Sequence, residues 1–456
     1  MATPLHDHIY FTRLELDNVK SFGEGQFVDF TVDGVHPARW TLILGENNTG
    51  KTTILQCLAR MRPDVANRIE GDPTGQRGFL PEFAAEDDNA RLDALVRNGR
   101  DVDCGIRASM VAGYSFDGRG GRPNRITSTA LIQRRGGKLD DANWAGDRDR
   151  EFGSPILFAY GAGRHVAVAS ADEEIPDPIA SLFDSTVELI DAERILQRLD
   201  YHVVKFKERR ATMRLRAVTE MLATILPEVR RPSDIVINPP PTAGLGPVPH
   251  GVRVETPHGQ VPLDQLSLGY QTVTAWTIDI AWRLFNAYPD SARPMREPAI
   301  VIVDEIDLHL HPSWQRELRR SLTMHFPNVQ FIATAHSPLM AQDLLDQNLV
   351  LLRLDPAEGA VEIDNDPAVV KDWSVDQLLT SELFGLDSAR SPATSAAVRR
   401  RLELLSKDSL NDVELDEMAD LDARLAFIGT DPEEIDEDRQ SVIDRARAIL
   451  RMRREA

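Results

Sequence analysis

The chain has 456 residues and a formal net charge of -20, enough length for one large domain or two to three ordinary ones. This charge argues against a wholly basic nucleic-acid-binding surface, although it leaves room for a local basic groove. The two cysteines, Cys57 and Cys104, do not form a disulfide framework or a metal cluster. The start of the sequence lacks a signal-peptide pattern, and no apolar run reaches the roughly 18 residues of a membrane span. These features predict a cytoplasmic protein.

The first predicted strands precede a glycine-rich phosphate loop. Residues 9–16 and 26–30 partly alternate between apolar and polar side chains, and residues 40–44 form an apolar run. A helix is expected from residue 52 to residue 60. The G-x-x-x-x-G-K-T loop between them is Gly45, Glu46, Asn47, Asn48, Thr49, Gly50, Lys51 and Thr52, followed by Thr53. In such a loop the backbone N–H groups surround phosphate oxygens, the lysine contacts the β- and γ-phosphates and the threonine ligates Mg²⁺. The sequence therefore predicts nucleotide binding here.

The next segment is predicted to be mostly antiparallel β-structure. Helical spacing is expected only near residues 87–97, whereas two strands near residues 106–111 and 125–133 flank a glycine-rich turn. Residues 137–153 are predicted to be a polar loop. The apolar strand of residues 155–160 ends in Gly161-Ala162-Gly163-Arg164, which is either part of a functional site or a plain tight turn.

A helical insertion is expected between residues 178 and 237. Apolar side chains recur there at helical spacing. Its middle part is basic and contains one acidic residue, Glu208, against Lys205, Lys207, Arg209, Arg210, Arg214 and Arg216. This run is either a contact for a nucleic-acid phosphate backbone or a solvated helix face.

The rest of the chain alternates helices and strands before a helical tail. A proline-rich connector (238–249) leads to a hairpin (251–263), a long helix (266–288), a buried strand (299–303), a helix (312–324), a strand (329–334), a helix (338–345) and a strand (349–354). The tail, residues 371–456, has thirteen carboxylates and one arginine between residues 408 and 438. We expect this acidic tail to bind a partner or to mediate oligomerisation.

Three later motifs complement the phosphate loop. Asp304 and Glu305 end the 299–303 strand, where Asp304 is suited to support Mg²⁺ and Glu305 to activate the attacking water. His336 follows the next strand, from which an imidazole can reach the γ-phosphate. Ser267 and Gly269 open the long helix, whose N-terminus is a second anion-binding position. A second such position is useful if it closes over the nucleotide of another copy.

The order of these motifs resembles that of the ATP-binding-cassette ATPases. Among them it is most similar to the RecF, SMC and overcoming-lysogenisation-defect (OLD) class, and to the ATPases of Septu and retron antiphage systems. The segments that carry the resemblance are residues 45–53, 267–271, 301–312, 335–338 and 373–379. The resemblance covers roughly residues 9–385, and the tail beyond them does not indicate a particular family.

The resemblance implies a role for each matching residue. Gly45 to Thr53 would bind ATP, Thr52 and Asp304 would hold Mg²⁺, and Lys51, Glu305 and His336 would act in catalysis. Ser267, Gly269 and Gln271 would contact the nucleotide of the opposite subunit, and Asp307 would face that subunit. The sequence departs from transporter ATPases at Leu268, where glycine is usual, and it has no obvious lobe-linking glutamine. His309 and His311 have the spacing of a pair of metal ligands. They fall in the loop expected to face the partner subunit, and we favour this interface role over metal binding.

The resemblance also implies an architecture. We expect an α/β ABC-ATPase (P-loop NTPase) head with a mixed β-sheet, an antiparallel β lobe, a helical insertion and a C-terminal helical tail. The expected domains are residues 1–177 and 238–370 for the two parts of the head, 178–237 for the insertion and 371–456 for the tail.

Three functions remain open at this point. The leading one is a Mg²⁺-dependent ATPase of a bacterial antiphage complex that dimerises head to tail and controls a separate effector, plausibly an HNH-type nuclease acting on nucleic acid. The second is a RecF-like DNA repair or recombination ATPase that binds DNA without an effector. The third is a nucleotide-sensing scaffold with little turnover. A transporter ATPase and a nuclease site within this chain are disfavoured.

Overall fold

The computed structural model describes most of the chain in fifteen segments. They are residues 8–64, 80–81, 95–96, 102–118, 123–135, 138–146, 154–164, 177–227, 229–239, 250–256, 259–341, 348–355, 359–366, 391–407 and 410–425. Two compact units are present, Met1–Val375 and Asp376–Ala456. The expected helix at 87–97, apart from residues 95–96, and residues 240–249, 342–347, 367–390 and 426–456 lie outside the described segments.

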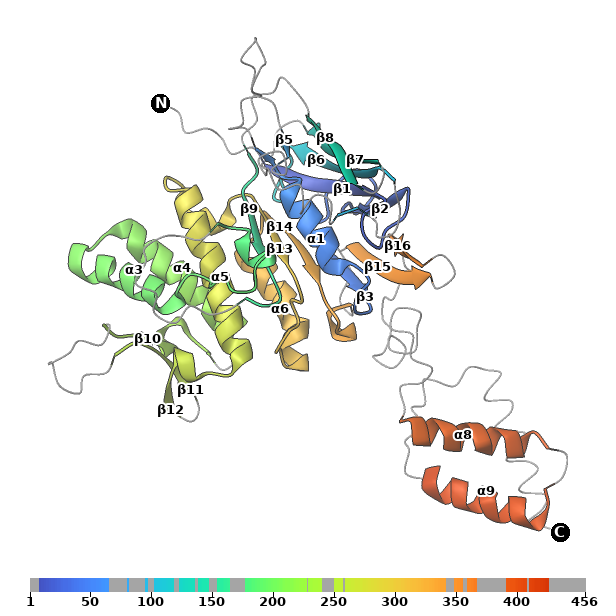
Figure 1. The fold of residues 1–456 in the computed structure, drawn as a ribbon. Helices are drawn as coiled ribbons and strands as arrows, with labels where there is room; N and C mark the ends of the chain where they lie inside the picture. Colours follow the sequence, from blue (N-terminus) through green and yellow to red (C-terminus); the bar gives the residue numbers. More distant parts are fainter. Residues whose placement is uncertain are drawn as a thin grey trace. The chain divides into compact units, whose positions relative to one another are not determined.

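The first unit is organised around a six-stranded sheet, shown in Figure 1. Its strands follow the order β16-β15-β3-β14-β13-β9, and all neighbours are parallel except β15 and β16. The bounds are β3 Trp40–Gly45, β9 Leu157–Tyr160, β13 Ala299–Val303, β14 Val329–Thr334, β15 Asn348–Asp355 and β16 Ala360–Asp364. Every residue of β13 and β14 is buried, as expected of strands covered on both faces. This order places β14 between the strand of the phosphate loop and the strand that ends at Asp304.

A second, antiparallel sheet has the order β2-β1-β6-β7-β8. Its strands are β1 Ile9–Asp17, β2 Gln26–Asp29, β6 Cys104–Ala112, β7 Asn124–Arg135 and β8 Lys138–Gly146. The predicted polar loop of residues 137–153 is therefore wrong over β8, which pairs along β7. Polar side chains are tolerated in such a strand because an antiparallel edge strand needs no continuous apolar run.

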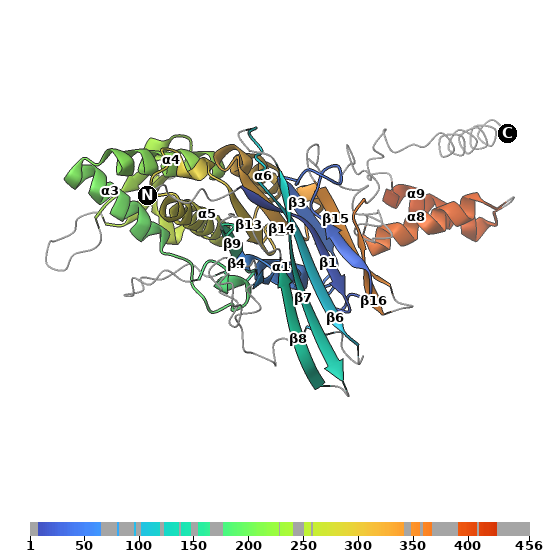
Figure 2. The ribbon, with the colours of Figure 1, turned by 90° about the horizontal axis from the view of Figure 1, so that it is seen from above.

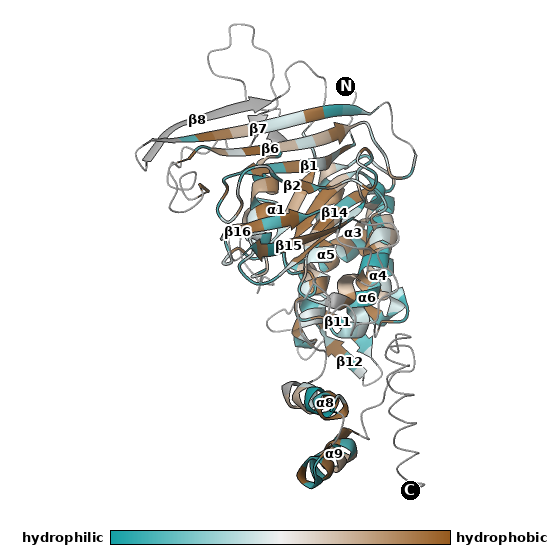
Figure 3. Cartoon of the chain, turned by 90° about the vertical axis from the view of Figure 1, so that its right-hand side faces the viewer, coloured by the Kyte–Doolittle hydropathy of each residue, from teal (hydrophilic) through white to brown (hydrophobic). Residues whose placement is uncertain are grey.

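The main hydrophobic core lies between these two sheets, with helix α1 (Lys51–Arg60) inside it. Figure 2 shows α1 between the strands of the central sheet and those of the antiparallel sheet. Ile54, Leu55 and Leu58 of α1 are fully buried in this cluster. In Figure 3 the central strand β14 carries mostly the hydrophobic colour. Burial of this helix fixes the phosphate loop that precedes it.

Polar side chains join the two sheets at one end. Gln330 of β14 accepts a hydrogen bond from the N–H of Phe11 and donates one to the carbonyl oxygen of the same residue. The hydroxyl of Tyr10 donates to the carbonyl oxygen of Asn328 at 2.7 Å. These bonds hold β1 and β14 in a fixed position relative to each other, because leaving a buried polar group unpaired costs free energy.

Four long helices complete the first unit. They are α3 Ala192–Phe206, α4 Arg209–Ile225, α5 Leu268–Ala287 and α6 Pro312–His325. Helices α3 and α4 confirm the expected helical insertion, and α5 and α6 confirm the predicted helices nearby. Helix α5 is buried nearly all round, which explains its almost continuous apolar and small side chains.

Short elements fill the remaining described segments. A three-stranded sheet contains β10 Ile235–Ile237, β11 Val252–Thr256 and β12 Gly259–Pro262, and a small pair contains β4 Pro63–Asp64 and β5 Leu80–Pro81. The predicted hairpin is present as β11 and β12, whereas β10 and β16 were not predicted. The predicted 338–345 helix begins as a 3-10 helix, η6 Pro338–Ala341, and its remaining residues lie outside the described part.

The second unit contains a helical hairpin, α8 Pro392–Leu405 and α9 Asp412–Leu425, and this part of the tail is helical as expected. Ala397, Leu404 and Leu421 form its small core. Arg400 of α8 pairs with Glu417 of α9 through two hydrogen bonds of 2.9 Å.

Candidate nucleotide-binding site

The candidate site lies where the parallel strands β3, β13 and β14 end at the same edge of the central sheet. Each strand end carries one of the motifs that the sequence indicated. The motifs meet because parallel neighbouring strands have their carboxyl ends at the same edge of the sheet. The phosphate loop follows β3, Asp304 and Glu305 follow β13, and His336 follows β14.

The phosphate loop has the backbone that its glycines allow. Gly50 has φ 90°, in the left-handed region, and a Cβ there would lie 2.8 Å from the ring of Phe22, so a side chain is excluded twice. Helix α1 begins at the next residue, and its N-terminal N–H groups and dipole favour an anion. Glu46, Asn47 and Asn48 are exposed on the loop, whereas Thr49 and Thr53 are buried.

The ammonium group of Lys51 lies inside the loop. Its Nζ atom donates hydrogen bonds to the carbonyl oxygens of Gly45 at 2.7 Å and Glu46 at 2.8 Å. Burial lowers the pKa of Lys51, and the carboxylates of Asp304 and Glu305 oppose that shift. A phosphate group would supply the negative charge that this partly buried cation lacks.

Asp304 is bonded on both of its carboxylate oxygens. Thr52 of α1 donates to Oδ2 at 2.7 Å, and Thr334 at the end of β14 donates to Oδ1 at 2.6 Å. Asp304 is 4% exposed, so these hydroxyls also satisfy a buried charge. The predicted metal ligands Thr52 and Asp304 are therefore adjacent. Two neighbouring hard oxygen donors fit Mg²⁺, which takes its other ligands from water and substrate phosphates.

Glu305 has a strained backbone that its neighbours hold in place. Its φ of 45° lies in the left-handed region, which residues with a side chain adopt rarely. Its N–H donates to the hydroxyl of Thr334 at 2.7 Å, and its carbonyl oxygen accepts from Arg164 at 3.0 Å. The Glu305 carboxylate lies 3.8 Å from Nε2 of His336. The two predicted catalytic groups are thus brought together at the open edge of the sheet.

Asp307 stabilises the loop that carries His336. Its Oδ2 atom accepts hydrogen bonds from the N–H groups of His336 at 3.0 Å and Ser337 at 2.7 Å. Gln315 of α6 bonds the hydroxyl of Ser337 and donates to the carbonyl oxygen of Leu310 at 3.1 Å. In this structure Asp307 positions the histidine within its own chain, and its predicted role toward a partner stays a prediction.

The predicted signature corner is presented at the start of α5. Ser267 and Leu268 are exposed, and the Ser267 side chain caps none of the N–H groups of α5. Gly269 packs directly on the following loop, since a Cβ there would lie 2.3 Å from the carbonyl oxygen of His309. Gln271 donates to the carbonyl oxygens of Asp264 and Leu266, both at 2.7 Å, so here it shapes the loop before the helix.

Arg164 belongs to this site, although the sequence left the end of β9 undecided. The side chain is 6% exposed and donates to the carbonyl oxygens of Gly161 at 2.8 Å, Asp304 at 2.7 Å and Glu305 at 3.0 Å. Burial lowers its pKa to about 10, so the guanidinium stays protonated near neutral pH. Its signal in the sequence was the position after a buried strand parallel to β13.

Of the two histidines His309 and His311, His311 has a structural role. The Nδ1 atom of His311 accepts from the N–H of Ser313 and lies 2.8 Å from its hydroxyl, which caps α6. Across the described residues, no group of three or more histidine, cysteine or acidic side chains could hold a metal ion. No helix in the described part is long and apolar enough to cross a membrane.

Comparison with known protein families gives two short matches. Residues 13–98 match a family described as an AAA domain, and residues 261–341 match a family described as "AAA domain, putative AbiEii toxin, Type IV TA system". The two segments contain the phosphate loop and the motifs from α5 to β14 respectively. The expected fold, an α/β P-loop ATPase head with a mixed sheet and an antiparallel lobe, is confirmed.

Similar proteins include a Septu protein and a retron ATPase. Septu protein PtuA of Bacillus mycoides (strain KBAB4) is 37% identical over 164 residues, which is 36% of this chain and 22% of that protein. The probable ATPase of retron Ec83 of Escherichia coli is 47% identical over 89 residues, which is 20% of this chain and 16% of that protein. Each match therefore spans less than a quarter of the relative. The resemblance to Septu and retron ATPases is confirmed, within these segments.

Among solved structures, the head resembles the SMC head domain from Thermotoga maritima, with 15% identity and a TM-score of 0.36 over 78% of this chain and 98% of that one. It also resembles the recombination mediator protein RecF, with 11% identity and a TM-score of 0.38 over 79% of this chain and 100% of that one.

Proposed function

We propose that this protein is the Mg²⁺-dependent ATPase subunit of a bacterial antiphage defence complex. It binds ATP between two heads arranged head to tail, hydrolyses it to ADP and phosphate, and so controls a separate effector. The observation that carries this proposal is the hydrogen-bonded contact between Thr52, the last residue of the phosphate loop, and Asp304 after β13. The names of the Septu and retron relatives support the defence role.

The residues at the sheet edge divide the chemistry between them. The loop N–H groups and Lys51 hold the phosphates, and Lys51 exchanges its two carbonyl partners for phosphate oxygens. Thr52 and Asp304 would hold Mg²⁺, which neutralises charge on the β- and γ-phosphates when bound. Glu305 accepts the proton of the attacking water, and His336 orients that water and the γ-phosphate. Thr334 and Arg164 keep the Glu305 backbone in place for this task.

The open corner at Ser267 and Leu268 supports an interface between two copies. The first N–H groups of α5 and the exposed Ser267 hydroxyl would bind the γ-phosphate held by the phosphate loop of the partner subunit. Gly269 ties this corner to the loop from Glu305 to His311. Loss of the γ-phosphate removes this bridge and loosens the dimer, which couples hydrolysis to a conformational change.

Hydrolysis is tested with Glu305→Gln in the full chain. The variant should bind ATP as the natural protein does, while turnover falls by about 10²-fold or more, the usual contribution of a general base. Glu317→Gln, on the exposed face of α6, is the matched control and should leave turnover unchanged. Equal turnover in the Glu305→Gln protein would reject the assigned mechanism.

The shared site is tested by mixing two inactive proteins, Lys51→Ala and Ser267→Arg. In a head-to-tail dimer, one of the two sites in each mixed dimer has both an intact phosphate loop and an intact Ser267 corner. Random mixing should then restore about a quarter of the natural turnover, because half of the dimers are mixed. A mixture as inactive as its components would show that each subunit uses its own corner.

The effector is proposed to be a separate protein, plausibly an HNH-type nuclease, that docks on the acidic helical tail and acts on nucleic acid. The hairpin of the second unit has exposed apolar side chains for such a contact, with Leu402 52% and Val413 77% exposed. Co-expression with the product of the neighbouring reading frame tests this. Leu402→Asp with Val413→Asp should abolish co-purification and phage protection while ATP turnover remains.

A further inference from the structure

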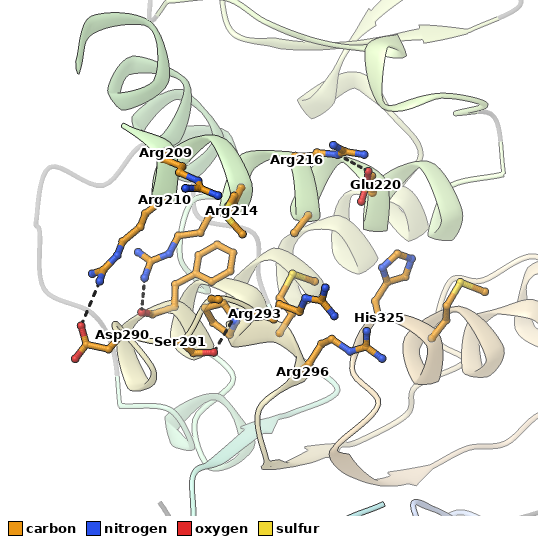
Figure 4. A pocket seen from close by; sticks show the side chains of 17 residues that line it. Arg209, Arg210, Arg214, Arg216, Glu220, Asp290, Ser291, Arg293, Arg296 and His325 are labelled. Carbon is orange, nitrogen blue, oxygen red and sulfur yellow. Dashed lines mark hydrogen bonds and ion pairs between the residues drawn. The ribbon is translucent and has the colours of Figure 1, made fainter. Parts of the chain in front are cut away.

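A pocket lies away from the nucleotide-binding edge, between α4 and the segment that follows α5 (Figure 4). Its volume is about 940 Å³, and α6 closes one end with Met324 and His325. Helix α5 has 20 residues and runs from the Ser267 corner to the pocket at Phe285. A helix of that length spans about 30 Å, so this pocket is separate from the ATP site.

The pocket is strongly basic in a chain whose net charge is negative. Arg209, Arg210, Arg214 and Arg216 come from α4, and Arg293 and Arg296 come from the facing segment. Two carboxylates also line it, and each has a partner. Glu220 accepts from Arg216 at 2.7 Å, and Asp290 lies 3.5 Å from Arg210. An excess of positive charge remains, and it faces the pocket from two sides.

Among the described residues, three of these arginines have no partner for their guanidinium group. Within the described residues, Arg209, Arg293 and Arg296 are exposed and make no side-chain hydrogen bond or ion pair. Arg214 lies 5.1 Å from the ring of Phe285 and donates to two main-chain carbonyl oxygens. Burial and the neighbouring Arg210 lower the pKa of Arg214, a sign of crowded positive charge that a bound anion would relieve.

Most of the other lining residues are apolar. Met213 and Met324 are 43% and 57% exposed, and their thioethers suit contact with a planar ring. Nε2 of His325 is buried and has no hydrogen-bond partner among the described residues. The imidazole of His325 is nevertheless one of the side chains that line the pocket.

We propose that this pocket binds a nucleotide, with its phosphates on the arginines and its base against Met213, Met324 and His325. The nucleotide is either free or part of a single strand, since both present the same phosphate and base chemistry. Guanidinium groups bind phosphate through paired N–H donors, and unstacked bases pack on apolar and sulfur-containing side chains. The pocket volume lies in the usual range for small-ligand sites.

The structure narrows the basic run of the sequence to particular residues. Four arginines of that run line the pocket, whereas Lys205 and Lys207 lie outside it. Arg293 and Arg296, about 80 positions later, complete it from the opposite side. These positions allow a matched test. Replacing Arg293 and Arg296 by glutamate changes the net charge by the same amount as replacing Lys205 and Lys207 by glutamate.

The experiment measures binding of a 5′-phosphorylated, fluorescein-labelled hexathymidylate to the full chain in EDTA. Arg293→Glu with Arg296→Glu should weaken binding by about tenfold or more, and the salt dependence should fall by about 1.4 units of slope for two lost phosphate contacts. Lys205→Glu with Lys207→Glu is the control and should weaken binding by less than about threefold. Arg293→Gln with Arg296→Gln repeats the test with a milder change should the reversed pair fold poorly.

Competition distinguishes the source of the nucleotide. Displacement of the probe by thymidine monophosphate indicates a free nucleotide, and displacement only by unlabelled hexathymidylate indicates a strand. Three results would overturn the proposal: equal weakening by the two reversed pairs, equal competition by inorganic tripolyphosphate, or equal affinity for a blunt duplex. ATP turnover should be unchanged in the Arg293 and Arg296 variants, so this proposal can fail while the ATPase assignment stands.

Discussion

The buried Arg164 side chain donates a hydrogen bond of 2.7 Å to the main-chain carbonyl oxygen of Asp304. A second bond, to the carbonyl oxygen of Glu305, holds the next residue, whose φ is 45°. Arg164 thus connects the end of β9 to the end of β13, where the two carboxylates stand. It acts through the backbone and does not itself contact the reacting atoms.

Replacement of Arg164 by methionine should both destabilise the head and impair catalysis. Buried carbonyl oxygens would lose their donor, so we expect the free energy of unfolding to fall by about 2–4 kcal/mol. Turnover should fall more than ATP affinity, because Glu305 loses its position while the phosphate loop is untouched. Arg164→Lys should recover part of both. Denaturant unfolding and steady-state turnover check this, with Arg316→Met on the exposed face of α6 as the control. Unchanged turnover in a folded Arg164→Met protein would contradict the positioning role.

Asp304→Asn should separate Mg²⁺ binding from ATP binding. The two threonine hydroxyls can reorient toward an amide, so the fold should persist, but the negative oxygen donor for Mg²⁺ is lost. We expect equal ATP affinity for both proteins in EDTA, and a Mg²⁺-dependent increase in affinity only for the natural protein. Titration calorimetry with and without Mg²⁺ measures this, and Asp290→Asn, remote from the sheet edge, serves as control. A retained Mg²⁺ effect would remove Asp304 from the metal site.

Gly269→Ala should uncouple the Ser267 corner from the rest of the site. A Cβ there would lie 2.3 Å from the carbonyl oxygen of His309, so either α5 or that loop must shift. Such a displacement at a shared site can lower turnover by about 10²-fold, whereas binding to the phosphate loop alone should persist. Gly105→Ala, whose added Cβ would have its nearest neighbour at 3.4 Å, is the control. Normal turnover in the Gly269→Ala protein would show that the close approach has no functional consequence.

Stability of the head should depend on a buried ion pair in α5. Asp279 is fully buried and accepts from Arg283 and from the hydroxyl of Tyr160, both at 2.6 Å. Burial, and then Asp279, raise the pKa of Tyr160 well above its ordinary value, so the hydroxyl stays protonated and donates. Arg283→Met would leave Asp279 charged without its cation and should cost about 3–5 kcal/mol of unfolding free energy.

A double replacement provides the comparison for that ion pair. Asp279→Leu combined with Arg283→Met removes both charges, and most of the lost stability should return. Thermal or denaturant unfolding of the single and double variants measures the difference. A double variant no more stable than Arg283→Met alone would show that packing, and not the unpaired charge, sets the cost.

Sequence alone determined the parts of this protein that depend on local chemistry. The phosphate loop between a buried strand and a helix, the carboxylates after an apolar run and the histidine after the next strand each follow from short-range pattern. The expected central strands and the long helices were confirmed for the same reason, since burial on both faces leaves an apolar run that is visible without a fold.

Only the tertiary structure decided which distant residues meet. Thr334 looks ordinary in the sequence, and the segment that ends in Arg164 was left undecided between a site and a turn. Each side chain bonds the backbone or carboxylate of the Asp304–Glu305 corner because parallel strands end at one edge. Strand β8 was missed because its polar residues gain their partners from β7 and not from a local pattern. The basic residues of α4 line a pocket only because the fold brings Arg293 and Arg296 opposite this helix. Strand pairing and helix packing set these contacts over long separations, which no local pattern of side chains encodes.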